Sequence, residues 1–244
     1  MGFEKGKMVA LVTAGYKNLG MYISRELKEA GYKVVATYRS NERKAVEFSK
    51  RYDIPVYPAE LSEKGEVQAL FAWIEANHGS IGVVVNNASS FPTGPLRTMP
   101  VEDFEDAFKS SIFASNLIIK RAIPMMKDIR GGRIINIGMA GAGEIRSYLE
   151  VAAHASAKAA FSILTLSWAN ELREDKITVN MISPGIIDYQ WRTDSWRDRM
   201  RKIAPSGELT APGQIASAVR FIAERPDVTG RIIEVDPEFK QQSI

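Results

Sequence analysis

The chain has 244 residues and contains no cysteine. This absence excludes disulfide bonds, metal centres built on thiolates and a cysteine nucleophile, and we expect no metal site. The sequence also lacks a secretory leader pattern and any apolar run long enough to span a membrane. We therefore expect a cytoplasmic protein that does not act at a membrane.

The sequence also lacks a strong excess of basic over acidic residues or the reverse. The sequence carries 32 lysines and arginines against 29 aspartates and glutamates, a formal net charge of +3. The basic residues are scattered, and so small an excess does not favour a nucleic acid as partner. The hydrophobic share of 45% is ordinary for a globular protein and supplies a large core. We expect a small molecule as the ligand.

The chain is rich in a regular alternation of short apolar runs and helical patterns. The runs are continuous, which indicates strands buried on both faces. Strands are expected at Met8–Val12, Lys33–Tyr38, Pro55–Pro58, Ile81–Val85, Arg133–Ile137, Ile177–Ile182 and Arg231–Val235. Helices are expected at Met21–Ala30, Ala45–Arg51, Glu66–Ala76, Glu102–Lys127, Val151–Glu174 and Ile215–Ala223. This alternation predicts an α/β fold, a Rossmann-type doubly wound parallel sheet with helices on both faces. We expect residues 1–244 to form a single domain.

The segment 186–207 departs from this alternation. It is long, weakly patterned and rich in tryptophan, arginine and aspartate, and it follows a strand whose carboxyl end should border the ligand site. In a compact domain such a stretch is more often a functional lid than an accident. Its aromatic and cationic side chains suit a flat heterocycle such as a pterin. An amphipathic helix whose tryptophans pack inward is an equally good interpretation.

A glycine-bearing turn joins the first strand to the first helix. A pyrophosphate would need a tight turn here, with main-chain amides and a helix N-terminus facing it. Gly15 and Gly20 allow close approach, and Asn18 suits a left-handed or capping position. The expected cofactor contacts in this turn are Thr13, Gly15, Tyr16, Lys17, Asn18, Leu19 and Gly20. A purely structural turn is the alternative, since the spacing is not Gly-x-Gly-x-x-Gly.

The turn resembles the Thr-Gly-x-x-x-Gly-x-Gly turn of the short-chain dehydrogenase/reductase family. Ala14 and Asn18 stand at its first and second glycines, and Gly20 keeps the third. Residues 86–89, Asn-Asn-Ala-Ser, resemble the family's Asn-Asn-Ala-Gly after the fourth strand, and residues 177–185 resemble its sixth strand, which ends in Pro-Gly. Residues 87–91 are similar to the pteridine reductase branch. The resemblance covers essentially the whole chain.

This resemblance implies a bound dinucleotide, and two basic residues bear on which one. Arg39 directly follows the second strand, where a site for NAD usually places an acidic residue against the ribose 2′-hydroxyl. Arg39 and Ser40 offer a cation and a hydroxyl to a 2′-phosphate, and Lys17 stands where NADP-preferring relatives carry a second basic residue. We expect NADP(H), with solvated surface charges as the alternative. The other implied cofactor contacts are Glu60, Leu61, Asn87, Ala88, Ser89, Lys158, Pro184, Gly185 and Ile187.

The family transfers a hydride between the nicotinamide and a carbonyl or alcohol, using a tyrosine as proton donor, a lysine, a serine and an asparagine. Only the lysine is kept here, as Lys158. At the other three implied catalytic positions, His154 replaces the tyrosine, Met139 the serine and Ser111 the asparagine. Tyr148 is a further candidate proton donor.

His154 lies one helical turn before Lys158 on the same face. An imidazole can donate a proton, but Lys158 and an oxidised nicotinamide should lower its pKa and leave it neutral. Two hypotheses follow. In the first, the protein is an NADP(H)-dependent oxidoreductase that reduces a carbonyl or pterin-like small molecule, with His154 or an ordered water delivering the proton. In the second, it is a catalytically inactive family member that binds NADP(H) as a sensor or interaction protein.

The resemblance also implies self-association. Relatives usually pair through two long helices, here Glu102–Lys127 and Val151–Glu174, and often form tetramers. The residues Asp236-Pro237-Glu238 depart from the family's Asp-Gly-Gly. This departure weakens the expectation of the second interface that a tetramer needs. A homo-oligomer, either a dimer or a homotetramer, is therefore expected.

Overall fold

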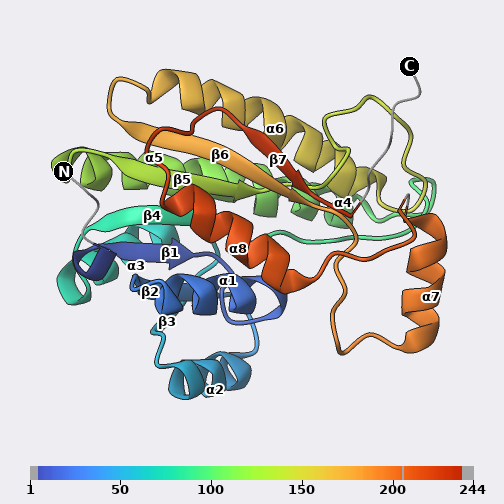
Figure 1. Ribbon diagram of the computed structural model, residues 1–244, viewed down its shortest axis with the longest axis horizontal. Helices are drawn as coiled ribbons and strands as arrows, with labels where there is room; N and C mark the ends of the chain where they lie inside the picture. The colour runs from blue at the N-terminus through green and yellow to red at the C-terminus, as the bar shows by residue number, and fades with distance from the viewer. Residues whose placement is uncertain (1–4, 205, 238–244) are drawn as a thin grey trace.

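The computed structural model describes residues 5–204 and 206–237 (Figure 1). Pro205 of the predicted lid and Glu238 of the C-terminal tripeptide lie outside the described residues.

Seven strands form one sheet in the described part of the chain, in the order β3-β2-β1-β4-β5-β6-β7. Every pairing between neighbours is parallel. The chain runs outward from β1 to β3 and then returns to β4 on the other side of β1, which confirms the predicted doubly wound sheet. The strands are β1 (Val9–Val12), β2 (Lys33–Tyr38), β3 (Val56–Pro58), β4 (Ile81–Asn86), β5 (Gly132–Ile137), β6 (Ile177–Pro184) and β7 (Ile232–Val235).

Helices cover both faces of this sheet, as predicted. One core cluster joins the sheet to α1 and α8, and the other joins it to α3, α5 and α6. Val83 and Val85 of β4 belong to the first cluster, whereas Ile81 and Val84 belong to the second, so a strand of this kind needs apolar residues at every position. No helix within residues 5–204 and 206–237 is long and apolar enough to cross a membrane. The α-helices are α1 (Asn18–Glu29), α2 (Glu42–Tyr52), α3 (Lys64–Asn77), α4 (Val101–Phe108), α5 (Ala114–Asp128), α6 (Ala152–Glu171), α7 (Asp194–Ile203) and α8 (Pro212–Ala223).

The long helix expected over 102–127 is interrupted. A π-helical turn, η2 (Lys109–Phe113), separates α4 from α5. Within it the Ser110 hydroxyl donates to the main-chain oxygen of Asp106, 2.6 Å away, and so competes with the regular helical ladder. Such turns put an extra residue into a helix and are frequent at functional sites. Here the turn faces the loop that follows β4.

The predicted lid segment contains a helix. Thr193 caps α7 by accepting from the Trp196 main-chain N–H, and Arg197 ties the helix back to Asp188 at 2.7 Å. Ile187 pairs with Thr210 in an isolated parallel bridge, which fastens both ends of the segment together. In Figure 1, α7 (orange) stands on the side of the molecule toward which the strand arrows point.

Candidate functional site

The turn between β1 and α1 is held tight by the chain itself. Ala14 and Asn18 stand where the turn that this one resembles has two of its glycines, and they adopt φ values of +50° and +46°. This left-handed conformation is costly for alanine and tolerated by asparagine. A Cβ on Gly15 would lie 2.7 Å from the Ser24 hydroxyl, and one on Gly20 would strike the main-chain oxygen of Ala14. Both glycines are therefore required by packing.

Thr13 and Asn87 connect this turn to the end of β4. The Thr13 hydroxyl accepts hydrogen bonds from the main-chain N–H groups of Asn87 and Ala88, both at 2.8 Å. The Asn87 side-chain amide donates in return to the Thr13 main-chain oxygen at 2.9 Å. The sequence predicts that both side chains contact a cofactor, and in the structure the Thr13 hydroxyl and the Asn87 amide nitrogen bond within the protein. These bonds tie the β1–α1 turn to the end of β4.

A hollow of about 600 Å³, part of it open to solvent, lies at the carboxyl ends of β1, β2 and β4. Helix α1 begins at its edge without a side-chain cap from Lys17, and the Leu19 main-chain N–H of its first turn donates to the Tyr189 hydroxyl of the predicted lid. Eight of the predicted cofactor residues line the hollow, namely Tyr16, Lys17, Arg39, Ser40, Glu60, Leu61, Ala88 and Ser89.

Tyr16 shapes one wall of this hollow. Its hydroxyl donates to the Ser40 main-chain oxygen at 2.7 Å, and its ring packs edge-on against Tyr38. The Lys17 ammonium lies 5.4 Å from the centre of the Tyr16 ring. The wall therefore presents the Lys17 cation beside a fixed aromatic ring, next to the first turn of α1.

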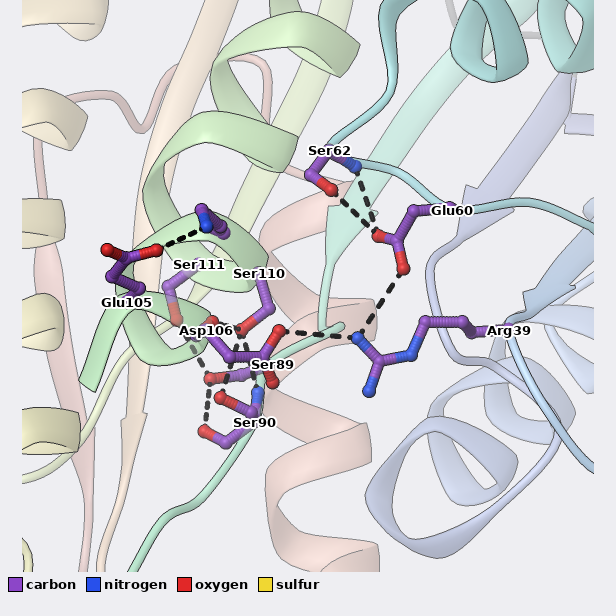
Figure 2. A network of polar contacts seen from close by, with 10 residues as sticks. Arg39, Glu60, Ser62, Ser89, Ser90, Glu105, Asp106, Ser110 and Ser111 are labelled. Carbon is purple, nitrogen blue, oxygen red and sulfur yellow. Dashed lines mark hydrogen bonds and ion pairs between the residues drawn. The ribbon is translucent and has the colours of Figure 1, made fainter. Parts of the chain in front are cut away.

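Arg39 stands between two carboxylates at the mouth of the hollow (Figure 2). Its Nη1 lies 3.5 Å from a carboxylate oxygen of Glu60 and 3.4 Å from one of Asp106. Glu60 also accepts from the hydroxyl and the main-chain N–H of Ser62. Sequence reasoning missed Asp106, because 67 positions separate it from Arg39.

His154 is buried in α6 against the loop that follows β4. Its Nδ1 lies 3.0 Å from the Ser90 main-chain oxygen, and its ring packs edge-on against Phe91. Burial, reinforced by the charge of Lys158, lowers the pKa of His154 to about 3. The ring is thus neutral at physiological pH. Because a carbonyl oxygen can only accept, the single proton sits on Nδ1 and Nε2 carries a lone pair.

Lys158 is buried on the same side of α6. Its Nζ donates to the main-chain oxygen of Ile137 at the end of β5, 2.7 Å away. Burial lowers the pKa of Lys158 to about 7. An amine in this range can give or take a proton near neutral pH, which is the property that acid–base chemistry needs.

The other candidate positions have their polar groups engaged or lack them. Ser111, fully buried in η2, shares a hydrogen bond of 2.8 Å with the Ser89 hydroxyl. Met139, just after β5, offers a thioether, which is a weak acceptor and no donor. The Tyr148 hydroxyl donates to the Gly141 main-chain oxygen at 2.7 Å. None of these three therefore presents a spare proton.

The predicted contacts after β6 lie apart from the lining of the hollow. Gly185 donates from its main chain to Val235, and a Cβ on it would come within 2.5 Å of the Asp236 carboxyl carbon. Pro184 accepts from the Ala140 main-chain N–H, which joins the ends of β5 and β6, and Ile187 begins the lid through its bridge.

Aromatic rings and the guanidinium of Arg192 stack together in the lid. Tyr189 stacks on Trp191 with ring centres 5.7 Å apart. Arg192 lies over both Trp191 and Trp196, at 4.2 Å and 4.7 Å from the ring centres. The tryptophans thus stack with an arginine, and Trp191 is 60% exposed, so its ring is not packed inward. Across the described residues, no group of three or more histidines, aspartates and glutamates is arranged to hold a metal ion.

Comparisons with known proteins agree along most of the chain. The family model described as enoyl-(acyl carrier protein) reductase matches residues 14–237. The chain is 31% identical over 219 residues to the acetoacetyl-CoA reductase of Rhizobium meliloti, covering 88% of this chain and 90% of that protein. It is 29% identical over 245 residues to the 2-dehydro-3-deoxy-D-gluconate 5-dehydrogenase of Formosa agariphila, covering 95% and 92%.

Two solved structures are similar over nearly the full length. A blue fluorescent protein from a metagenomic library, crystallised in complex with NADPH, has a TM-score of 0.85 and 27% identity, covering 96% of this chain and 98% of that chain. A double mutant of a short-chain dehydrogenase/reductase from Serratia marcescens has a TM-score of 0.87, 23% identity and the same coverage, and supports the fold alone.

Proposed function

This chain belongs to the short-chain dehydrogenase/reductase family of oxidoreductases, and on that premise we propose that it uses NADP(H) to reduce a carbonyl or pterin-like small molecule. The observation that carries the proposal is the hollow beside the N-terminus of α1, where Lys17 and Arg39 place two cations. Members of the family bind nicotinamide dinucleotides, and the cations favour the form with a 2′-phosphate.

The residues fit such a cofactor. The first-turn amides of α1 suit a pyrophosphate, and Arg39, Ser40 and Lys17 suit a phosphorylated ribose. We propose that Glu60 and Leu61 border the adenine, and that Lys158 holds the second ribose. Thr13, Gly15, Asn18, Leu19, Gly20, Asn87, Ala88, Ser89, Pro184, Gly185 and Ile187 complete the proposed binding site by shape and main-chain contacts.

The bound dinucleotide supplies a hydride, and this chain must supply the matching proton. His154 holds its one proton against the Ser90 oxygen, and the Tyr148 hydroxyl points at Gly141. Lys158 has one described acceptor for its three protons and a pKa of about 7. We assign the transferable proton to Lys158 Nζ, delivered directly or through a water. The lone pair of His154 Nε2 would orient that water or the substrate hydroxyl.

The lid supports the choice of a flat substrate. Trp191 and Trp196 stack with Arg192, and Trp191 remains largely exposed, so its ring can cover a planar heterocycle. We propose that residues 186–207 act as this lid within a single domain of residues 1–244. Self-association into a dimer or tetramer is part of the same proposal. It would use the two predicted long helices, which in the structure are α4, η2 and α5 for the first and α6 for the second.

The proposal is tested by binding first and turnover second. NADPH and NADH are titrated against the protein by fluorescence, and quinonoid pterins, quinones and keto compounds are then screened for NADPH oxidation. We expect submillimolar binding of NADPH and turnover with at least one compound class. If neither dinucleotide binds at millimolar concentration, the proposal is wrong.

The engaged proton of His154 favours a second candidate function. With tyrosine, serine and asparagine all replaced, the chain would be a catalytically inactive NADP(H)-binding member that acts as a sensor or interaction protein. Tight NADPH binding without turnover of any compound in the screen would support this second function against the first.

A further inference from the structure

Arg39 is already paired with two carboxylates at the place proposed for the 2′-phosphate, and these carboxylates would repel the phosphate. In Figure 2 the guanidinium reaches between Glu60 on one side and Asp106 of α4 on the other. Two carboxylates thus face one cation. A phosphate dianion that approached Arg39 would meet both carboxylates within a few ångströms, whereas a ribose hydroxyl would meet two acceptors.

The two carboxylates differ in how they are held. Glu60 is fastened to Ser62 by two hydrogen bonds, at 3.0 Å to the hydroxyl and 3.3 Å to the main-chain N–H. Asp106 reaches Arg39 from a different wall, because it lies on α4 just before the η2 turn whose Ser110 lines the hollow. The Arg39–Asp106 contact therefore runs from the end of β2 to α4.

We propose that Asp106 is a specificity-determining residue, which draws Arg39 toward α4 and lowers the preference of the site for NADP(H) over NAD(H). The inference rests on the proposed function, because it takes the hollow as the site of the adenosine half of the dinucleotide. Both partners are more than a third exposed, at 55% and 39%, so the pair is screened and exchangeable. A bound 2′-phosphate can replace Asp106 as the partner of Arg39, and breaking this ion pair lowers the affinity for the phosphorylated dinucleotide.

The test compares Asp106→Asn with the wild-type protein. The probes are 2′,5′-ADP and 5′-AMP, which differ only in the 2′-phosphate, and dissociation constants are measured by calorimetry at low ionic strength. We expect the variant to bind 2′,5′-ADP about three- to tenfold more tightly and 5′-AMP within about twofold of wild type. The ratio of NADPH to NADH affinity should shift by the same factor.

Glu105→Gln is the matched control. It removes the same charge one position earlier on α4, where the carboxylate pairs with Lys109. We expect it to change neither affinity by more than about twofold. In the Arg39→Gln background, Asp106→Asn should lose most of its effect, because Asp106 acts chiefly through Arg39 and only the screened repulsion between its carboxylate and the 2′-phosphate remains. Asp106→Ser repeats the test if the asparagine variant does not fold.

Three results would overturn the inference: equal changes for both probes, an equal gain in Glu105→Gln, or a full gain that persists without Arg39. A wild-type protein that binds NADPH, combined with an unchanged Asp106→Asn ratio, rejects this inference and leaves the proposed function standing. A wild-type protein that binds neither dinucleotide rejects both.

Discussion

At the scale of single residues, the protonation of His154 decides what this position can do. The ring is buried, its Nδ1–H is directed at the Ser90 oxygen, and its Nε2 faces away with a lone pair. A phenol at this position would carry a proton that can be transferred. The imidazole carries one that is already bonded to Ser90, so we propose that this position serves as an acceptor rather than a proton donor.

The buried imidazole also makes the stability of the fold depend on pH. Its pKa falls from 6.5 to about 3 on folding, so the unfolded chain binds the extra proton between these values. Stability is therefore lost as pH falls from 6.5 toward 3, on the order of a few kcal/mol in total. In His154→Phe the acid-side loss should be smaller. Urea unfolding between pH 6.5 and pH 3 measures the free energy of unfolding of both proteins. If this free energy falls equally steeply with pH in the two, the lowered pKa of His154 is contradicted.

Lys158 should govern the pH dependence of turnover. Its pKa of about 7 means that the ammonium form is lost as pH rises through neutrality. If Nζ supplies the proton, the rate of NADPH-dependent reduction should fall above pH 7, and Lys158→Met should lose about 100-fold or more. The measurement is kcat against pH with NADPH affinity followed in parallel. A rate that holds level well above pH 7 would contradict the role.

At the scale of elements, the η2 turn acts as the support of the site. It directs Ser110 and Ser111 at the loop that follows β4, where Ser110 accepts from the Ser90 main-chain N–H and Ser111 meets Ser89. The same Ser90 holds His154 through its carbonyl. One turn of helix thus positions both the wall of the hollow and the His154 ring on α6.

Removing the Ser110 hydroxyl should loosen this support. Ser110→Ala leaves the Ser90 N–H without its acceptor, which should destabilise the protein by about 1–2 kcal/mol in chemical denaturation. The matched control is Ser167→Ala, whose exposed hydroxyl only bonds back to its own helix at Ile163. The control should change stability by less than about 0.5 kcal/mol. Equal effects in the two variants would show that η2 is not a support.

Most elements could be predicted from the sequence because their signals are local. The apolar runs at 33–38 and 81–85 are buried on both faces, and this alone makes them recognisable as strands. The η2 turn could not be predicted, because it depends on where Ser110 finds a partner in a distant loop. The pairing of Arg39 with Asp106 is likewise a product of topology, which brings β2 and α4 together.

At the scale of the whole molecule, several exposed apolar side chains bear on the proposed self-association. Ile163 and Leu166 on α6 are 69% and 45% exposed, and Phe113 just before α5 is 58% exposed. These side chains lie on the elements proposed for self-association, and an apolar patch of this kind marks an interface more often than bare surface.

We therefore expect Ile163→Glu to shift the protein toward monomer, because a buried carboxylate without a partner is costly in an apolar interface. Ile203→Glu is the matched control, since Ile203 is 63% exposed at the end of α7, an element outside the proposed interface. Light scattering coupled to size exclusion should give a smaller mass for the first variant and the wild-type mass for the second. If the wild-type protein is already a monomer, or if Ile203→Glu alone dissociates it, the pairing through α5 and α6 is wrong. A retained assembly in Ile163→Glu would equally contradict it.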